Sequence, residues 1–88
     1  MLKDDELKKL RDLLAEQYEW PHDYLFKFVV PKDKVSEVRA LFPGGEIQER
    51  ESKTGKYVSV TVEMELESAD VVVAVYQQAS KIKGLMSL

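Results

Sequence analysis

The side chains best suited to bind a ligand stand together in one polar stretch near the middle of the chain. Between Arg50 and Tyr57 the sequence supplies three cations, two hydroxyls and an aromatic ring around a single glycine. Cations and hydroxyl donors gathered at one turn are suited to hold an anion or the acidic segment of a protein partner. We therefore predict a binding site made of Arg50, Ser52, Lys53, Thr54, Gly55, Lys56 and Tyr57.

The same stretch also has a purely structural interpretation, as the turn of a β-hairpin. Gly55 is free to adopt a positive φ, which tight turns often require. Hydroxyl groups in turns commonly bond the nearby backbone, and Tyr57 would then pack at the base of the hairpin. In that case the turn only sets the register of the two strands that it joins.

Outside this stretch the sequence offers no set of residues typical of catalysis or metal binding. An enzyme site needs a nucleophile with a base, paired carboxylates or a metal cluster. His22 is the only histidine and stands just after Pro21 at a strand entry, and a surface-loop histidine is the ordinary case for such a residue. Glu63, Glu65 and Glu67 stand at alternate positions, as on the solvated face of a strand. We predict no enzymatic activity, no cofactor and no metal, and a stand-alone enzyme is the less favoured alternative.

Length and composition indicate one small globular domain. The 88 residues leave no room for a second core, and 44% hydrophobic with 33% charged residues is typical of a folded chain. The formal net charge of -3 disfavours nucleic-acid binding. No apolar run reaches the roughly 20 residues of a membrane helix, and no signal peptide or cysteine is seen. We therefore expect a cytoplasmic protein that does not bind a membrane.

The stretch 58–66 predicts a strand with one buried and one exposed face. Apolar and polar residues alternate along it without a break, and this period of two is the mark of such a strand. Val60 and Val62 share the buried face, and Ser59 and Thr61 share the other. The pattern is typical of an antiparallel sheet that is covered on one side only.

Apolar spacing and end signals predict two helices before that strand. The first spans 5–18, with Asp4 or Asp5 as its N-cap, and ends before Trp20-Pro21 because a residue preceding proline avoids helical geometry. The second opens at residue 31 and stops at Pro43-Gly44-Gly45. Its apolar face consists of Val35, Val38, Leu41 and Phe42.

A third helix is predicted over 69–81, although its valines also suit a buried strand. Ser68 is a favourable N-cap, and the polar residues after Tyr76 continue a helix more readily than a strand. The valines from Val71 to Val75 are apolar on more than one side. They are therefore a candidate surface for self-association, unless the N-terminal helix covers them.

The remaining strands complete an α+β fold. We predict strands over 24–30, at the sheet edge over 46–52, and over 82–88. The order is an extra N-terminal helix followed by β-α-β-β-α-β, the ferredoxin-like sandwich with one antiparallel sheet and two helices on one face. Right-handed crossovers place the first strand beside the third and the fourth. We assign residues 1–19 to the added helix and 20–88 to the ferredoxin-like domain.

The other face of that sheet is a further candidate surface. The N-terminal helix, a second copy of the chain or a ligand could cover it. RNA-recognition motifs share this element order and stack bases on aromatic side chains of the face, but here Tyr57 is the only aromatic residue expected there. RNA binding is therefore an alternative. The predicted face carries Leu25, Lys27, Val29, Ser59, Thr61 and Leu85.

Four features, taken in order, carry a family resemblance. They are the pair Trp20-Pro21, the aromatic strand Tyr24–Phe28, the hairpin Arg50–Ser59 and the hydrophobic ending Ile82–Leu88. From Trp20 onward the chain thereby resembles the YbeD-like family of uncharacterised bacterial proteins, also called domain of unknown function 493. The resemblance implies a fold similar to ACT domains, which are regulatory domains that bind small effectors such as amino acids.

These observations together predict a small regulatory or interaction module without catalytic activity. We expect it to bind a small anionic or amino-acid-like effector, or a protein partner, through the hairpin and the sheet edge. A homodimer is a further expectation.

Overall fold

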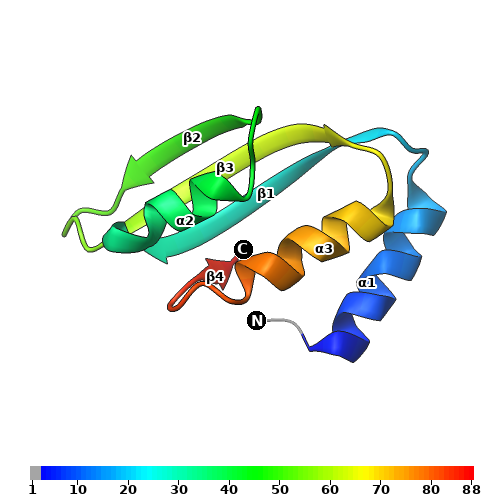
Figure 1. Ribbon diagram of the computed structural model, residues 1–88, viewed down its shortest axis with the longest axis horizontal. Coiled ribbons are helices and arrows are strands. Elements are labelled where there is room, and N and C mark those ends of the chain that lie inside the picture. The colour runs from blue at the N-terminus through cyan, green and yellow to red at the C-terminus, as the bar shows by residue number, and fades with distance from the viewer. Residues whose placement is uncertain (1–2) are drawn as a thin grey trace.

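The computed structural model describes residues 3–88 as three α-helices and one four-stranded antiparallel sheet (Figure 1). The helices are α1 (Asp4–Gln17), α2 (Val35–Ala40) and α3 (Ala69–Ala79), and a short 3-10 helix, η1 (Lys32–Lys34), precedes α2. The strands are β1 (His22–Pro31), β2 (Glu46–Glu51), β3 (Tyr57–Leu66) and β4 (Met86–Ser87).

The strands lie in the order β2-β3-β1-β4. β1 and β3 pair along their whole length, from His22 opposite Leu66 to Pro31 opposite Tyr57. β2 pairs with the outer side of β3, and β4 pairs with β1. The prediction that the first strand lies between the third and the fourth is confirmed, and so is the edge position of the polar strand.

The alternation of side chains along the central strands gives the sheet one buried face and one exposed face. On β1, Phe26 and Phe28 are buried. Leu25, just before Phe26, and Lys27, between the two phenylalanines, are exposed. β3 follows the same pattern and Val60 is fully buried. The predicted one-sided sheet is therefore confirmed. We call its exposed side the open face.

Helices α2 and α3 cover the same face of the sheet. Phe42, which follows α2, and Tyr76 of α3 both pack on Phe26, with ring centroids 5.2 Å and 5.4 Å away. Val38 and Val72 contribute fully buried side chains from the two helices. Because aromatic rings bury large apolar areas, this cluster is the centre of the hydrophobic core.

Helix α1 packs against α3, away from the open face (Figure 1). Leu7 and Leu14 are buried as part of the same core as the sheet, and Arg11 lies 3.6 Å from Asp70 of α3. The indole Nε1 of Trp20 donates to the carbonyl of Leu14 at 3.2 Å, which ties the end of α1 to the start of β1. The N-terminal helix is therefore excluded as the element that covers the open face.

The third predicted helix is confirmed as α3, in the stretch whose valines also suited a buried strand. The Ser68 side chain caps α3 by accepting a hydrogen bond from the Val71 amide at 3.4 Å. Val72, Tyr76 and Ala79 are buried at helical spacing. Val71 itself is exposed, so α1 covers only part of the valine stretch.

Two predictions about helix ends are wrong. The N-cap of α1 is Lys3, whose side chain makes no capping hydrogen bond, so neither Asp4 nor Asp5 has that role. Both acids instead lie in the first turn, where the helix dipole favours negative charge. α2 begins at Val35, after β1 and η1, rather than at residue 31. It ends at Ala40, before the predicted stop at Pro43-Gly44-Gly45, because the backbone continues into tight turns, with Phe42 N bonded to Arg39 O at 3.1 Å.

The predicted final strand is also too long, and one residue was placed on the wrong face. After α3 the chain makes successive turns, with Ile82 N bonded to Ala79 O and Leu85 N to Ile82 O. These turns direct Ile82 into the core, and only Met86 and Ser87 pair with β1. Leu85 packs against the core rather than on the open face.

The one-sided sheet predicts different costs for neighbouring residues of β3. Val60→Ala should lower the free energy of unfolding by about 1 to 3 kcal/mol, because it leaves a cavity in a fully buried site. Ser59→Ala should cost less than about 0.5 kcal/mol, since its side chain is exposed. Urea unfolding measures both, and equal losses would contradict the assignment of the two faces.

Candidate functional site

The predicted hairpin site is a tight turn between β2 and β3 whose hydroxyls serve the turn itself. Gly55 has a φ of 74° and its amide donates to Ser52 O at 3.0 Å. The Ser52 hydroxyl accepts from the Tyr57 amide at 3.3 Å, and the Thr54 hydroxyl accepts from the Lys56 amide at 3.5 Å. These bonds agree with the structural interpretation of both hydroxyls.

The cations of the hairpin are exposed and spread over two surfaces. Lys53 and Lys56 lie in the turn, whereas Arg50 lies on the open face opposite Ser59. Within residues 3–88 no carboxylate pairs with these three cations. Tyr57 stands at the base of the hairpin, where its carbonyl accepts from the Ser52 amide at 2.9 Å, and its side chain is 44% exposed on the open face. The structure therefore brings together only part of the predicted set.

The backbone at Gly55 gives a prediction for the hairpin. Gly55→Val should lower stability by about 1 to 2 kcal/mol, because its positive φ disfavours any side chain, especially a branched one. A Cβ at this position meets nothing within 4 Å, so the cost comes from the backbone alone. Thermal or urea unfolding measures it. Lys53→Ala is the control and should be nearly neutral; a neutral Gly55→Val would contradict the turn geometry.

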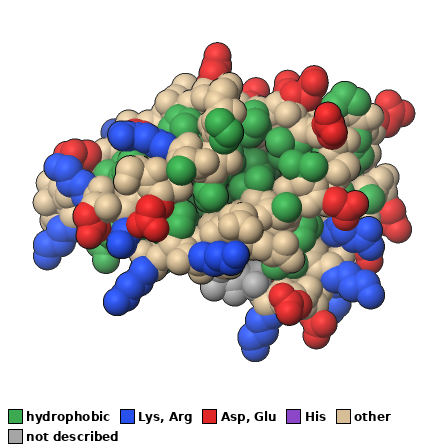
Figure 2. All heavy atoms as spheres, viewed as in Figure 1, with side chains coloured by type: hydrophobic (Ala, Val, Ile, Leu, Met, Phe, Trp, Pro, Cys, Tyr) green, Lys and Arg blue, Asp and Glu red, His purple; other side chains and the backbone are tan. Residues whose placement is uncertain are grey.

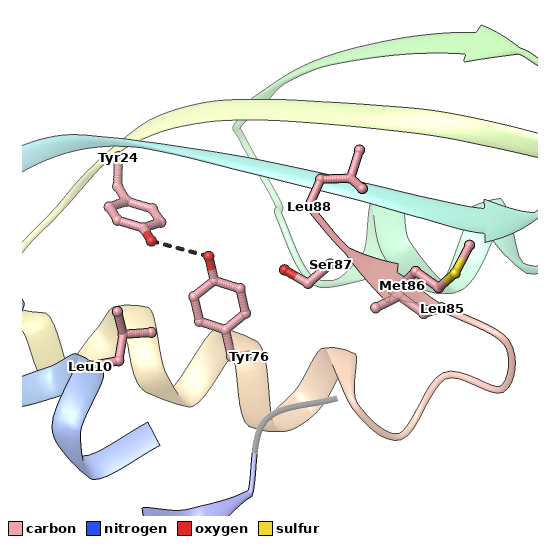
Figure 3. A pocket seen from close by; sticks show the side chains of 7 residues that line it. All are labelled: Leu10, Tyr24, Tyr76, Leu85, Met86, Ser87 and Leu88. Atoms are coloured by element: carbon pink, nitrogen blue, oxygen red, sulfur yellow. Dashed lines mark hydrogen bonds between the residues drawn. The ribbon is translucent and has the colours of Figure 1, made fainter. Parts of the chain in front are cut away.

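A second site was missed by sequence reasoning and lies between the sheet and the helices. It is a cavity of about 570 Å³, which we call the tyrosine pocket (Figure 3). Four separate parts of the chain form it, namely α1, β1, α3 and the C-terminal segment. Its lining residues are Leu10, Tyr24, Tyr76, Leu85, Met86, Ser87 and Leu88.

Two tyrosine hydroxyls are the main polar groups of the tyrosine pocket. The hydroxyls of Tyr24 and Tyr76 are 3.0 Å apart and hydrogen-bonded. Figure 3 shows the Ser87 hydroxyl pointing toward Tyr76, while the side chains of Met86 and Leu88 point away from the tyrosines. Because each phenol has one proton and two lone pairs, a bonded pair uses only one of its two protons. The second proton is available to an acceptor in the cavity.

Local structure explains how the two tyrosines meet. Tyr24 precedes Phe26 in the inward row of β1, and Tyr76 follows Val72 by one turn on the buried side of α3. Their rings pack edge to face, with centroids 6.4 Å apart. The apolar patterns of the sequence place both tyrosines on the buried faces of their elements. The signal that was overlooked is that a buried tyrosine hydroxyl needs a partner.

Burial keeps the inner tyrosine protonated. The removal of water raises the pKa of the Tyr76 phenol above its ordinary value, and the hydrogen bond with Tyr24 raises this pKa further. Tyr76 is therefore a neutral phenol at physiological pH. It can act as a hydrogen-bond donor.

The raised pKa of Tyr76 predicts a loss of stability in alkali. Above about pH 10 the phenol ionises in the unfolded chain but not in the folded chain. The unfolded state then binds fewer protons, so the free energy of unfolding falls as pH rises. Urea unfolding between neutral and strongly alkaline pH should show a steeper fall for the wild type than for Tyr76→Phe. Parallel pH profiles would contradict the burial of this hydroxyl.

The surface around these elements separates apolar from charged groups. On the face that Figure 2 shows, hydrophobic side chains gather in the middle and charged side chains lie mainly around them. Residues 3–88 contain no cluster of histidine and acidic residues arranged to hold a metal ion. Over the same residues no helix is long and apolar enough to span a membrane.

The fold and the two candidate sites define a small α+β domain with one covered sheet and an added N-terminal helix. Comparison with known families identifies its membership. The chain belongs to the YbeD-like family, described as protein of unknown function (DUF493), whose family profile matches residues 15–88. No curated protein and no solved structure shows a significant match to the chain.

Proposed function

We propose that this protein is a regulatory module without catalytic activity that binds a small effector in the tyrosine pocket. The observation that carries the proposal is the convergence of the Tyr24 and Tyr76 hydroxyls on a largely apolar cavity of about 570 Å³. Binding sites for small molecules are usually cavities of roughly 300 to 1,000 Å³ with apolar walls and a few polar groups. The pocket has that size and that composition.

The lining residues favour an effector with an apolar body and one hydrogen-bond acceptor. Leu10 and Leu85 supply apolar surface. The neutral phenols have a proton to donate, which suits a carboxylate or carbonyl oxygen on the ligand. An amino acid or a related small acid with an apolar side chain has both features.

The position of the pocket supports a regulatory role. The ligand would contact α1, α3 and the C-terminal segment together with β1. A ligand that binds only the folded arrangement of these elements stabilises it by mass action. Occupancy would thereby fix the position of α1 and of the C-terminal segment. A partner protein could sense that change.

The ferredoxin-like assignment is part of the same proposal. The order β2-β3-β1-β4 and the position of α2 and α3 on one face support it. We further propose a cytoplasmic location, since the chain has no cysteine.

A second candidate function uses the hairpin. Arg50, Lys53 and Lys56 have no carboxylate partner within residues 3–88, so they are free to bind an anion or an acidic segment of a protein. RNA binding is less favoured, because Tyr57 is the one aromatic side chain on the strands of the described open face.

A ligand screen tests the proposal. Nuclear magnetic resonance titrations with amino acids and small apolar carboxylates should shift the signals of Tyr24, Tyr76 and Leu85. Tyr76→Phe keeps the ring and removes one donor, so affinity should fall about 2- to 12-fold, as expected for one hydrogen bond of about 0.5 to 1.5 kcal/mol. Tyr18→Phe, a tyrosine outside the pocket, is the matched control and should leave affinity unchanged.

Two outcomes would overturn the proposed site. The first is a screen in which no compound shifts the pocket signals. The second is a ligand whose binding is lost in the triple variant Arg50→Ala, Lys53→Ala, Lys56→Ala but unchanged in Tyr76→Phe. That second result would move the function to the hairpin, and its binding should then weaken as salt rises.

A further inference from the structure

The open face carries several exposed apolar side chains. Leu25 of β1 is 47% exposed, Tyr57 of β3 is 44% exposed, and Met86 of β4 is 54% exposed. Leu88 follows Met86 by two residues and is 76% exposed. Apolar side chains gathered on one face usually mark an interaction surface.

One end of the open face is acidic. Asp23 lies opposite Glu65, and Leu25 lies opposite Glu63. Glu46 of β2 lies on the other side of Glu63. This end of the face therefore carries four carboxylates, spread over β1, β3 and β2.

The other end of the open face is basic. Lys27 lies two residues after Leu25 on β1. Val29 lies two residues after Lys27 and pairs with Ser59. Arg50 of β2 pairs with the other side of Ser59. The charge of the face therefore changes sign along the strands, from acidic near Leu25 to basic near Val29.

We propose that the open face is the interface of a symmetric homodimer, in which two copies stack face to face with their β1 strands in opposite directions. A two-fold axis between the sheets and perpendicular to the strands reverses one copy relative to the other. The acidic end of each face then lies over the basic end of its partner. This interface lies on the side of the sheet opposite the Tyr24 and Tyr76 side chains, and the two sites share the C-terminal segment, where Met86 and Leu88 also line the tyrosine pocket.

The strand register gives the pairs that such a dimer forms. With the axis over the row of Lys27 and Thr61, Arg50 lies over Glu46 of the partner subunit, because the two residues lie one row to either side. For the same reason Val29 lies over Leu25 of the partner subunit. Each contact occurs twice, since a two-fold interface is self-complementary. Lys27 packs its aliphatic part near the axis and turns its ammonium to water.

The size of the face indicates a weak dimer. β1 and β3 have 10 residues each and β2 has 6. At about 3.3 Å per residue and about 4.8 Å between strands, the face measures roughly 30 by 15 Å. Stable interfaces bury about 800 Å² per partner, and this face, at roughly 450 Å², is smaller than that. We expect a monomer–dimer equilibrium with a dissociation constant in the micromolar range.

The charges favour a second copy over a nucleic acid. The four carboxylates near the start of β1 repel phosphate groups, whereas a second copy places its Arg50 over one of them, Glu46. The partner must carry apolar, acidic and basic groups in the same arrangement. The chain itself meets that requirement.

Variants that reverse the charges of Arg50 and Glu46, singly and together, test the proposal. Analytical ultracentrifugation of the wild type should show the average mass rising with concentration. Arg50→Glu places a carboxylate over Glu46 of the partner subunit, and Glu46→Arg places two arginines together, so each should weaken the dimer about tenfold or more. The double variant E46R/R50E restores opposite charges and should return the dissociation constant to near the wild-type value.

Matched controls are Lys9→Glu and Glu16→Arg, which change the same charges on the exposed surface of α1. They should leave the dissociation constant unchanged. Circular dichroism checks that every variant is folded. As a second measurement on the wild type, the methyl signals of Leu25 and Met86 should shift with protein concentration, while those of Leu13 on α1 should not.

The proposal is overturned if the wild type stays monomeric up to about 1 mM, far above the micromolar dissociation constant expected for the dimer. It is also overturned if the wild type dimerises but Arg50→Glu and Glu46→Arg behave like the controls on α1.

Discussion

The burial of Phe26 and Phe28 beneath α2 and α3 is the interaction on which the other elements depend. These two rings contact both Phe42 and Tyr76, so one row of β1 side chains sets the positions of two helices. Because strand side chains alternate, the same burial forces Leu25 and Lys27 to the opposite side. α1 then packs on α3 and leaves that side open. The covered face and the open face thus both follow from the burial of Phe26 and Phe28 along β1.

Each face carries its own candidate function. The inward row continues from Phe26 to Tyr24, where the core gives way to the tyrosine pocket and a polar group meets apolar walls. The outward row of β1, with Leu25 and Lys27, belongs to the open face. Met86 of the neighbouring strand β4 is exposed on the same face. The two tyrosines and the open face lie on opposite sides of β1, and the C-terminal residues Met86 and Leu88 border both the pocket and the open face. A ligand in the pocket and a partner on the open face would be linked through β1, which supplies residues to each.

The sequence predicted the elements well where a period was long and unbroken. The alternation in β3 and the Ser68 cap of α3 were sufficient, because both are local signals. The end of the chain was harder to predict, since the turns that bury Ile82 and shorten β4 depend on contacts with distant residues. The tyrosine pocket could not be predicted for the same reason. Tyr24 and Tyr76 are 52 residues apart, and only the packing of α3 on β1 brings them together.

Solvent accessibility of assigned methyl groups tests the one-sided sheet most directly. The measurement is the relaxation of methyl signals by a soluble paramagnetic agent, made on a sample dilute enough to be monomeric. The account predicts strong relaxation of Leu25 and Met86, which are about half exposed, and none of Val60 and Val62, which are fully buried. If Leu25 and Met86 were protected in the dilute monomer, another part of the chain would cover the open face. The separation of the two surfaces would then be wrong.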